Sequence, residues 1–215
     1  MHPDWNNEIA RYCSENSSSE PEVLQELVRF TWLQTVNPRQ LSGHLQGRFL
    51  SLVSKLIRPT CILEIGTFTG YSAFCLAEGL QSAGVLHTIE ADAEIAHKAE
   101  VYLSKTPLSD RIKLHVGEAL SIIPDLNIQP ELIFVDAEKQ QYQAYTEICL
   151  PLMESGGIIL FDNTLWSMKV LDKRERENDA DTRNMHAFNQ WLTSLPEVEV
   201  LMLPLRDGLT MLRKK

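Results

Sequence analysis

Acidic and amide side chains directly follow two apolar runs in the second half of the chain. Asp136 ends the run in ELIFVDA, and Asp162 with Asn163 ends the run in GGIILFDNTLW. Polar groups of this kind are costly beside a buried strand unless something satisfies them. Oxygen donors without histidine or cysteine favour Mg²⁺, with Mn²⁺ or Ca²⁺ as alternatives. Although an Asp-Asn pair alone is also typical of a turn or cap, the three residues together are candidate ligands of a divalent cation.

Lys139 follows Asp136 by three residues, so we expect it on the first turn of the next helix, facing the same crevice. A lysine beside a metal in a half-buried site can serve as a general base. An exposed helix lysine is the alternative, because most lysines are solvated.

The turn EIGTFTGYS has glycines at positions 66 and 70 and therefore lacks the GxGxxG spacing of a dinucleotide site. Glu64 would repel a diphosphate there and would suit a cationic amine instead. Glu90 ends the second apolar run, 26 residues later, where it could accept hydrogen bonds from ribose hydroxyls. This pattern favours a positively charged nucleoside such as S-adenosylmethionine, and a tight turn without a ligand is the alternative.

Five short apolar runs alternate with amphipathic stretches from residue 61 onward. The runs are CILEIG, VLHTIE, IKLHV, ELIFVDA and GIILFDN. Near-continuous apolar runs, each followed by an amphipathic segment, indicate parallel strands that are covered on both faces. The sequence therefore predicts a doubly wound α/β sheet, and ligands bind such sheets at the carboxyl ends of the strands.

The two ends of the chain depart from this alternation. We expect N-terminal helices within residues 1–58, one with Ser19 as N-cap and Pro21 in its first turn and another in GRFLSLVSKLI. The charged stretch SMKVLDKRERENDADTRN lacks periodicity and predicts a long loop. VEVLMLPL and LTMLRKK flank RDG, which predicts a terminal hairpin and an antiparallel last strand. We expect a single domain over 1–215, with the sheet core in 59–215.

Composition limits the classes of partner. The 215 residues carry a net charge of −9, which gives no broad attraction to nucleic acid or anionic lipid. The four cysteines form no CxxC pair, and His87, His115 and His186 have no partners at metal spacing. There is no run of 18 apolar residues and no signal-peptide pattern, so we expect a cytoplasmic protein without a membrane segment.

Several of these motifs together resemble the cation-dependent O-methyltransferases, a family that includes catechol and caffeoyl-CoA O-methyltransferases. The resemblance spans roughly residues 40–213 and rests on LEIGTFTGYSA, IFVDAEKQQYQAY, GGIILFDNTLW and LPLRDGLTMLRK. It implies a mostly parallel, seven-stranded, Rossmann-like methyltransferase sheet. It also implies S-adenosyl-L-methionine as the methyl donor and a homodimer.

The resemblance assigns roles to individual residues. It implies that Asp136, Asp162 and Asn163 bind the metal, and that Lys139, with Asp136, is catalytic as the base or as the group that orients a phenol. The implied cofactor contacts are Ser42, Glu64, Gly66, Thr67, Ser72, Glu90, Ala119, Asp136 and Glu138.

The acceptor loop departs from the family pattern. The family favours glycine two residues after the tryptophan, where this chain has Met168, and it often has methionine where this chain has Leu41. We expect Trp166 and Ser167, in the loop 164–183, to contact the acceptor and Trp166 to wall an aromatic ring.

These observations predict a Mg²⁺-dependent O-methyltransferase that acts on a vicinal-dihydroxy, catechol-type small molecule. One alternative is methylation of a hydroxylated uridine in tRNA, as in some bacterial relatives; KRERENDADTR and LRKK offer local basic contacts for RNA. A second alternative is a non-catalytic nucleotide-binding α/β protein, which the complete set of acids and lysine disfavours.

Overall fold

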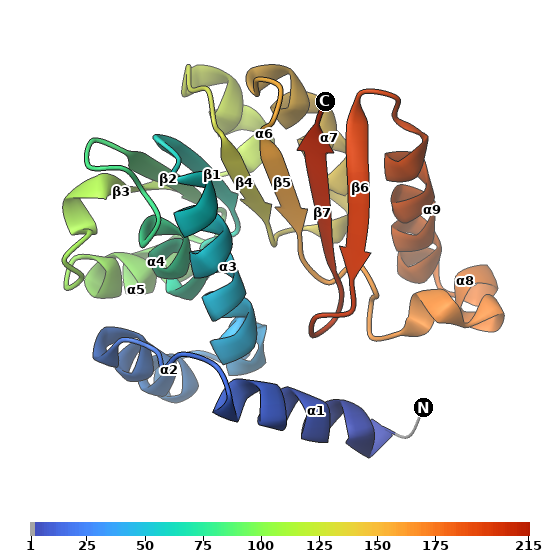
Figure 1. Ribbon diagram of the computed structural model, residues 1–215, viewed down its shortest axis with the longest axis horizontal. Helices are drawn as coiled ribbons and strands as arrows, with labels where there is room; N and C mark the ends of the chain where they lie inside the picture. The colour runs from blue at the N-terminus through green and yellow to red at the C-terminus, as the bar shows by residue number, and fades with distance from the viewer. Residues whose placement is uncertain (1–2) are drawn as a thin grey trace.

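A computed structural model of the chain describes residues 3–215, with side chains from residue 8 onward. Seven strands and nine α-helices are assigned within this range (Figure 1). The strands are β1 (Cys61–Ile65), β2 (Val85–Glu90), β3 (Ile112–Val116), β4 (Leu132–Val135), β5 (Ile158–Phe161), β6 (Val198–Leu203) and β7 (Leu209–Lys214). The helices are α1 (Pro3–Glu15), α2 (Glu22–Gln34), α3 (Gly43–Ile57), α4 (Tyr71–Ala77), α5 (Ala93–Leu103), α6 (Ala119–Ile122), α7 (Tyr142–Cys149), α8 (Lys173–Asn178) and α9 (Ala180–Ser194).

The strands form one sheet in the order β3-β2-β1-β4-β5-β7-β6. Strands β1 to β5 are parallel, and β7 runs antiparallel between β5 and β6. The predicted doubly wound sheet, terminal hairpin and antiparallel last strand are therefore confirmed. Because β1 lies between β2 and β4 while the chain crosses over after β3, the strand order reverses there, which is where open α/β sheets bind ligands.

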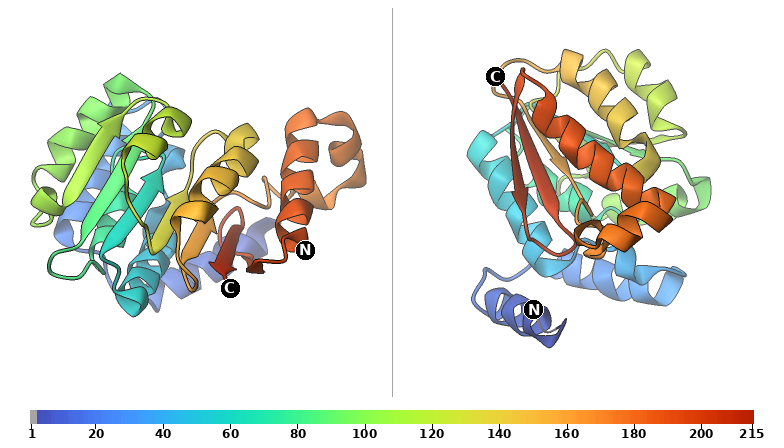
Figure 2. Two further views of the ribbon diagram at one scale, coloured as in Figure 1. Left: turned by 90° about the horizontal axis from the view of Figure 1, so that it is seen from above. Right: turned by 90° about the vertical axis from the view of Figure 1, so that its right-hand side faces the viewer.

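Helices cover both faces of the sheet (Figure 2). On one face, side chains of α2, α3, α4 and α5 pack against alternate strand residues such as Ile62 and Leu132. On the other face, α6, α7 and α9 pack against the intervening residues, such as Leu63 and Ile133. All four of these side chains are fully buried, which explains why the parallel strands carry apolar residues on both faces.

The N-terminal lead-in has three helices, where the sequence predicted two. The predicted cap at Ser19 is wrong, because α2 begins at Glu22 and its N-cap is Pro21. Pro21 has an extended backbone (φ −56°, ψ 147°), and a residue that precedes proline is pushed away from helical angles. The helix therefore cannot begin earlier.

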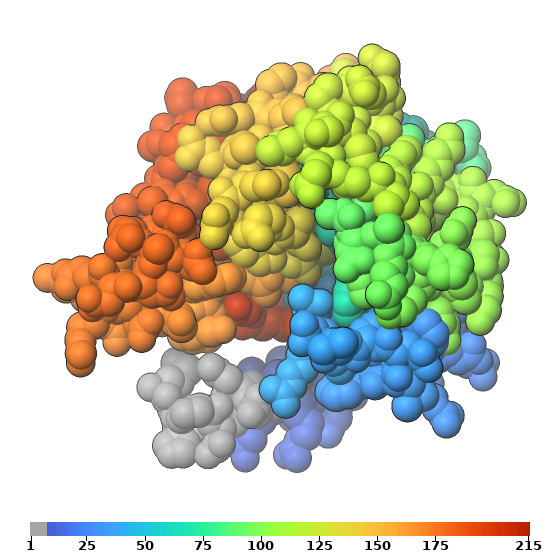
Figure 3. Space-filling view, turned by 180° about the vertical axis from the view of Figure 1, so that it is seen from behind, coloured from blue at the N-terminus to red at the C-terminus, as the bar shows by residue number. Residues whose placement is uncertain are grey.

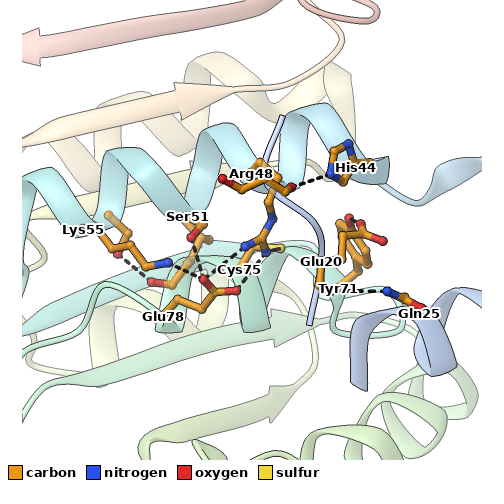
Figure 4. Close-up of polar contacts among 12 residues, drawn as sticks. Glu20, Gln25, His44, Arg48, Ser51, Lys55, Tyr71, Cys75 and Glu78 are labelled. Carbon is orange, nitrogen blue, oxygen red and sulfur yellow. Dashed lines mark hydrogen bonds and ion pairs between the residues drawn. The ribbon is translucent and has the colours of Figure 1, made fainter. Parts of the chain in front are cut away.

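Helix α3 is fixed to α4 by a group of polar contacts around Glu78 (Figure 4). The Glu78 carboxylate accepts hydrogen bonds from Arg48 at 2.8 Å, Ser51 at 2.7 Å and Lys55 at 2.5 Å. Arg48 and Glu78 are nearly buried, and a buried charge pair with further hydrogen bonds holds a defined geometry. Residues at the start of α3 consequently have a fixed position relative to the sheet.

The long loop predicted for residues 167–184 is wrong, because this segment contains α8 and the first turn of α9. The helix expected next, in MHAFNQWLTSL, is confirmed as the rest of α9. Asp172 and Asp179 cap the two helices by accepting hydrogen bonds from backbone N–H groups two residues further on. Helix α8 has no apolar stripe, so its caps and its charged pairs stabilise it instead. Among residues 3–215, no helix is both long and apolar enough to cross a bilayer.

Candidate active site

A cavity of about 1160 Å³ opens at the carboxyl ends of the parallel strands. Its walls come from segment 35–42 of the lead-in, from the loops that follow β1 to β5, and from the turn between β6 and β7. The face seen in Figure 3 is hollowed where the blue lead-in meets the green and yellow strand-end segments. The cavity is large enough for a nucleoside and a second small molecule together.

Gly66 brings backbone to the floor of this cavity. It has a φ of +98°, and a Cβ at this position would lie 2.0 Å from the carbonyl oxygen of Asp136. Its N–H donates to the Ile89 carbonyl at 2.9 Å, which ties the turn after β1 to the end of β2. Only glycine fits such a position, and the missing side chain lets the backbone after β4 approach the turn after β1 closely.

Glu64 is fully buried at the end of β1. The Thr88 hydroxyl donates to Oε2 at 2.5 Å, whereas Oε1 has no hydrogen-bond partner among the described residues. Burial raises the pKa of Glu64 to about 8, against the hydroxyls of Ser72 and Thr88, which lower it. A buried carboxylate oxygen without a partner is costly, so a cationic donor nearby would stabilise it.

The Glu90 carboxylate, at the end of β2, is held by two backbone N–H groups. It accepts from the Phe68 N–H at 2.8 Å and from the Asp92 N–H at 3.0 Å. Asp92 in turn caps α5. These contacts fix the orientation of the Glu90 side chain on the cavity wall, where it can accept further hydrogen bonds from hydroxyl groups.

Most of the other predicted cofactor contacts also line the cavity. Ser42 immediately precedes α3, Ala119 begins α6, and Glu138 precedes the short 3₁₀-helix η4 (Lys139–Gln141). The lining residues among the predicted cofactor contacts are Ser42, Gly66, Thr67, Ser72, Glu90, Ala119, Asp136 and Glu138. Glu64 is not part of the lining.

Asp136 and Asp162 follow neighbouring strands. Val135 and Phe161 are paired across β4 and β5, so the next residue on each strand stands at the same edge. Asp162 is 1% exposed, and its burial together with the nearby charge of Asp136 raises its pKa to about 6. Two carboxylates this close favour a cation between or beside them.

Lys139 supplies one such cation. Its Nζ donates to Asp136 Oδ1 at 2.7 Å, and its side chain is mostly buried. Lys139 begins the 3₁₀-helix η4. Both Lys139 and Asn163 line the cavity. The predicted first-turn position is therefore replaced by a 3₁₀ turn that leads directly into α7.

Comparison with known proteins decides what this arrangement is. A family model described as O-methyltransferase matches residues 14–215. The caffeoyl-CoA O-methyltransferase of Populus kitakamiensis is 34% identical over 221 residues, which cover 96% of this chain and 93% of that protein. The chain belongs to this O-methyltransferase family.

Solved structures agree with the assignment. The SAH-bound methyltransferase PaMTH1 of Podospora anserina superimposes with a TM-score of 0.91 at 28% identity, covering 100% of this chain and 97% of that one. The O-methyltransferase TomG of Streptomyces achromogenes, in complex with SAM, has a TM-score of 0.87 at 28% identity and covers 100% and 99%. The protein is thus an S-adenosylmethionine-dependent O-methyltransferase of the caffeoyl-CoA type.

In this methyltransferase, the loop after β5 has an unusual backbone. Asn163, Trp166, Ser167 and Met168 all have positive φ between 50° and 64°. The turn between β6 and β7 holds this loop: Thr164 N–H donates to the Gly208 carbonyl, Leu165 N–H donates to the Asp207 carbonyl, and Ser167 N–H donates to the Asp207 carboxylate. Residues other than glycine and asparagine are strained in the left-handed region. The contacts with the β6–β7 turn therefore hold the loop in a conformation with backbone strain.

The two predicted acceptor contacts have different surroundings. Trp166 lines the cavity, on the side of the β6–β7 turn. Ser167 does not line it, because its backbone is turned toward Asp207 on the exposed side. Asp162 also lies outside the lining, because its side chain is buried in the protein interior.

Two polar residues that the sequence did not single out belong to the methyltransferase site. Gln46 of α3 donates to Asp162 Oδ2 at 2.8 Å, and Arg206 of the β6–β7 turn lines the cavity. The RDG motif had indicated a hairpin turn at Arg206 but not a cavity residue. No pattern in GHLQGRFL distinguishes Gln46 from a solvated helix residue.

The residues present are compatible with the two groups that the family implies, S-adenosylmethionine and a divalent cation. The partnerless oxygen of Glu64, the Gly66 backbone in the cavity lining and the oriented Glu90 suit a cationic nucleoside. Within the described residues, no group of three or more His, Cys, Asp or Glu side chains is placed to hold a metal ion. Asp136 and Asp162 are only two carboxylates, so a metal here would also need the Asn163 amide oxygen, which is a hard donor of the type that Mg²⁺ accepts.

Proposed function

We propose that this methyltransferase methylates one hydroxyl of a vicinal-dihydroxy aromatic small molecule and requires Mg²⁺ or a similar divalent cation. The observation that carries the proposal is the juxtaposition of Asp136, Asp162 and Asn163 at one edge of the sheet, with Lys139 paired to Asp136. Several relatives are named for caffeoyl-CoA, whose caffeoyl ring carries two neighbouring hydroxyls. That shared chemistry supports a catechol-type acceptor.

The side chains would divide the work at the acceptor end of the cavity. Trp166 would stack against the aromatic ring and limit its orientations. Lys139 would take the proton of the reacting hydroxyl, or hold it, while Asp136 keeps the lysine in place. Asp136, Asp162 and Asn163 would hold the cation, which when bound lowers the pKa of a hydroxyl as a Lewis acid. Holding donor and acceptor in one cavity contributes through orientation.

The experiment is methyl transfer from labelled S-adenosylmethionine to catechols, acyl-CoA phenols and total tRNA, each with and without Mg²⁺. We expect a catechol-type compound to accept label only with the metal. Asp162→Ala should lose metal-dependent turnover by at least about 100-fold and keep SAH affinity within a few fold. Asp110→Ala, which removes an exposed carboxylate from the short 3₁₀-helix before β3 and outside the cavity lining, is the control and should retain full turnover.

Two results would contradict the proposal. Full turnover of a catechol by Asp162→Ala without divalent metal would show that the metal assignment is wrong. Label that enters tRNA and no small phenol would replace the acceptor class and leave the metal site standing.

The homodimer is likewise a proposal. Large apolar side chains are exposed on the lead-in: Trp32 and Leu33 on α2, and Leu52 and Leu56 on α3. An exposed apolar group of this size favours association. Sedimentation equilibrium measures it directly, and a monomer at micromolar concentration would contradict it.

A further inference from the structure

The side chain of Gln46 joins two charged groups inside the protein. It is fully buried, its Nε2 donates to Asp162 Oδ2 at 2.8 Å, and its Oε1 accepts from Arg206 Nη1 at 3.1 Å. A carboxylate can only accept hydrogen bonds and a guanidinium can only donate them, so the two neighbours fix the orientation of the amide. A buried amide with both ends matched in this way forms a defined link.

This link determines the orientation of the Asp162 carboxylate. Oδ2 is held by Gln46, and Oδ1 accepts from the backbone N–H of Asn163 at 2.8 Å. Each carboxylate oxygen accepts about two hydrogen bonds or ligands, so one site per oxygen stays available. Residues that hydrogen-bond to a metal ligand, without touching the metal themselves, are expected to tune the affinity for the metal.

Gln46 also separates Arg206 from Asp162. The guanidinium bonds the amide oxygen and the carboxylate bonds the amide nitrogen, so the two charges are bridged through a neutral group. Without this amide, a guanidinium near a buried carboxylate tends to pair with it directly. Such a pair would occupy the oxygen and compete with a cation.

Helix α3 connects this link to the methyl-donor side of the cavity. Ser42, which lines the cavity, immediately precedes α3, and Gln46 lies one turn further along the same helix. Since α3 is anchored to α4 through Arg48 and Glu78, the Gln46 side chain reaches Asp162 from a fixed base. We propose that Gln46 is a positioning residue that orients Asp162 for the divalent cation and keeps it from pairing with Arg206; this inference rests on the proposed metal dependence.

The test measures metal binding rather than turnover. Mn²⁺ binding to the SAH-saturated protein is followed by electron paramagnetic resonance, and SAH affinity is measured separately by calorimetry. Gln46→Met keeps the volume and loses both hydrogen bonds, and we expect Mn²⁺ to bind about 10- to 100-fold more weakly. SAH affinity should stay within about threefold, because Gln46 does not line the cavity.

Two further variants separate positioning from general damage. Ser54→Ala removes another buried hydrogen bond of α3, from the Ser54 hydroxyl to the Leu76 carbonyl, and should leave Mn²⁺ affinity unchanged. Gln46→Asn is shorter by one methylene and cannot span both partners, so it should weaken Mn²⁺ binding as well. It provides the measurement if Gln46→Met does not fold.

The outcomes are distinct. Wild-type Mn²⁺ affinity in a folded Gln46 variant would overturn this inference and leave the proposed function intact. An equal loss of affinity in Ser54→Ala would also overturn it, because the effect would then come from destabilised α3. Failure of the wild-type protein to bind Mn²⁺ would overturn the proposed metal dependence, and the inference with it.

Discussion

The backbone of Gly66 lies directly against the carbonyl oxygen of Asp136, with room for no side chain between them. This contact joins the turn after β1, where we expect the methyl donor, to the end of β4, which carries a proposed metal ligand. The two halves of the site therefore share one rigid point. A displacement of either segment would be transmitted to the other.

Gly66→Ala tests this contact. A Cβ would lie 2.0 Å from Asp136 O at a φ of +98°, so one of the two segments must move. We expect a loss of about 3 kcal/mol in unfolding free energy, from the left-handed backbone and the overlap together. We also expect markedly weaker SAH binding. Urea unfolding and calorimetry measure both quantities.

The control for that substitution is Gly43→Ala. Gly43 has a φ of +72°, but a Cβ added there would have no other atom within 4 Å, so only the backbone strain of about 1 kcal/mol should appear. Equal losses in the two variants would show that the contact with Asp136 contributes nothing.

The strand-end acids could be predicted because they need little beyond the order of the strands. Near-continuous apolar runs identified β1 to β5, and parallel neighbours place their carboxyl ends at one edge. Asp136 and Asp162 come together for that reason alone. Glu90 and Gly66 follow from the same rule.

The residues that sequence did not identify depend on long-range contacts. Gln46 is 116 residues from Asp162 and 160 from Arg206, so no local spacing indicates the link. The contact between the histidines of β2 and β3 was likewise not foreseen: His87 Nδ1 lies 3.0 Å from His115 Nε2 because the two strands are neighbours. Helix α8 was missed because its stabilising carboxylate caps resemble ordinary loop aspartates.

Glu64 should make the stability of the ligand-free protein fall as pH rises. Its pKa is about 8 in the folded protein, against an ordinary value of 4.5, so the folded state holds a proton that the unfolded state has lost. The contribution of Glu64 to the unfolding free energy is fully present below pH 4.5 and is lost as pH rises through about 8. Between these values the unfolding free energy should fall by up to about 1.4 kcal/mol per pH unit. Denaturant unfolding at a series of pH values measures it.

Glu64→Gln provides the reference for that measurement. The amide does not titrate, so the difference in unfolding free energy between wild type and variant should change in favour of the variant between pH 5 and pH 8. A constant difference across this range would mean that Glu64 is ionised in the folded protein at neutral pH.

Glycine at position 168 should give a more stable protein than alanine. Met168 has a φ of 64°, which is left-handed, so glycine relieves strain whereas alanine keeps it. We expect Met168→Gly to be more stable than Met168→Ala by about 1 kcal/mol. At Met202, in the extended strand β6, the order should reverse, with alanine more stable by about 0.5 kcal/mol. The same order at both positions would contradict the strain assigned to the loop after β5.

Lys139 is the last test, because its two proposed roles give different results. Lys139→Met removes the charge and the contact with Asp136, and turnover should fall by about 10²- to 10⁴-fold, with SAH affinity nearly unchanged. Lys139→Arg keeps a cation beside Asp136 but cannot release its proton. If Lys139 is the base, the arginine variant should be almost as slow as the methionine variant in single-turnover assays. If it retains more than about a tenth of wild-type turnover, Lys139 acts by orienting the hydroxyl and the base assignment is wrong.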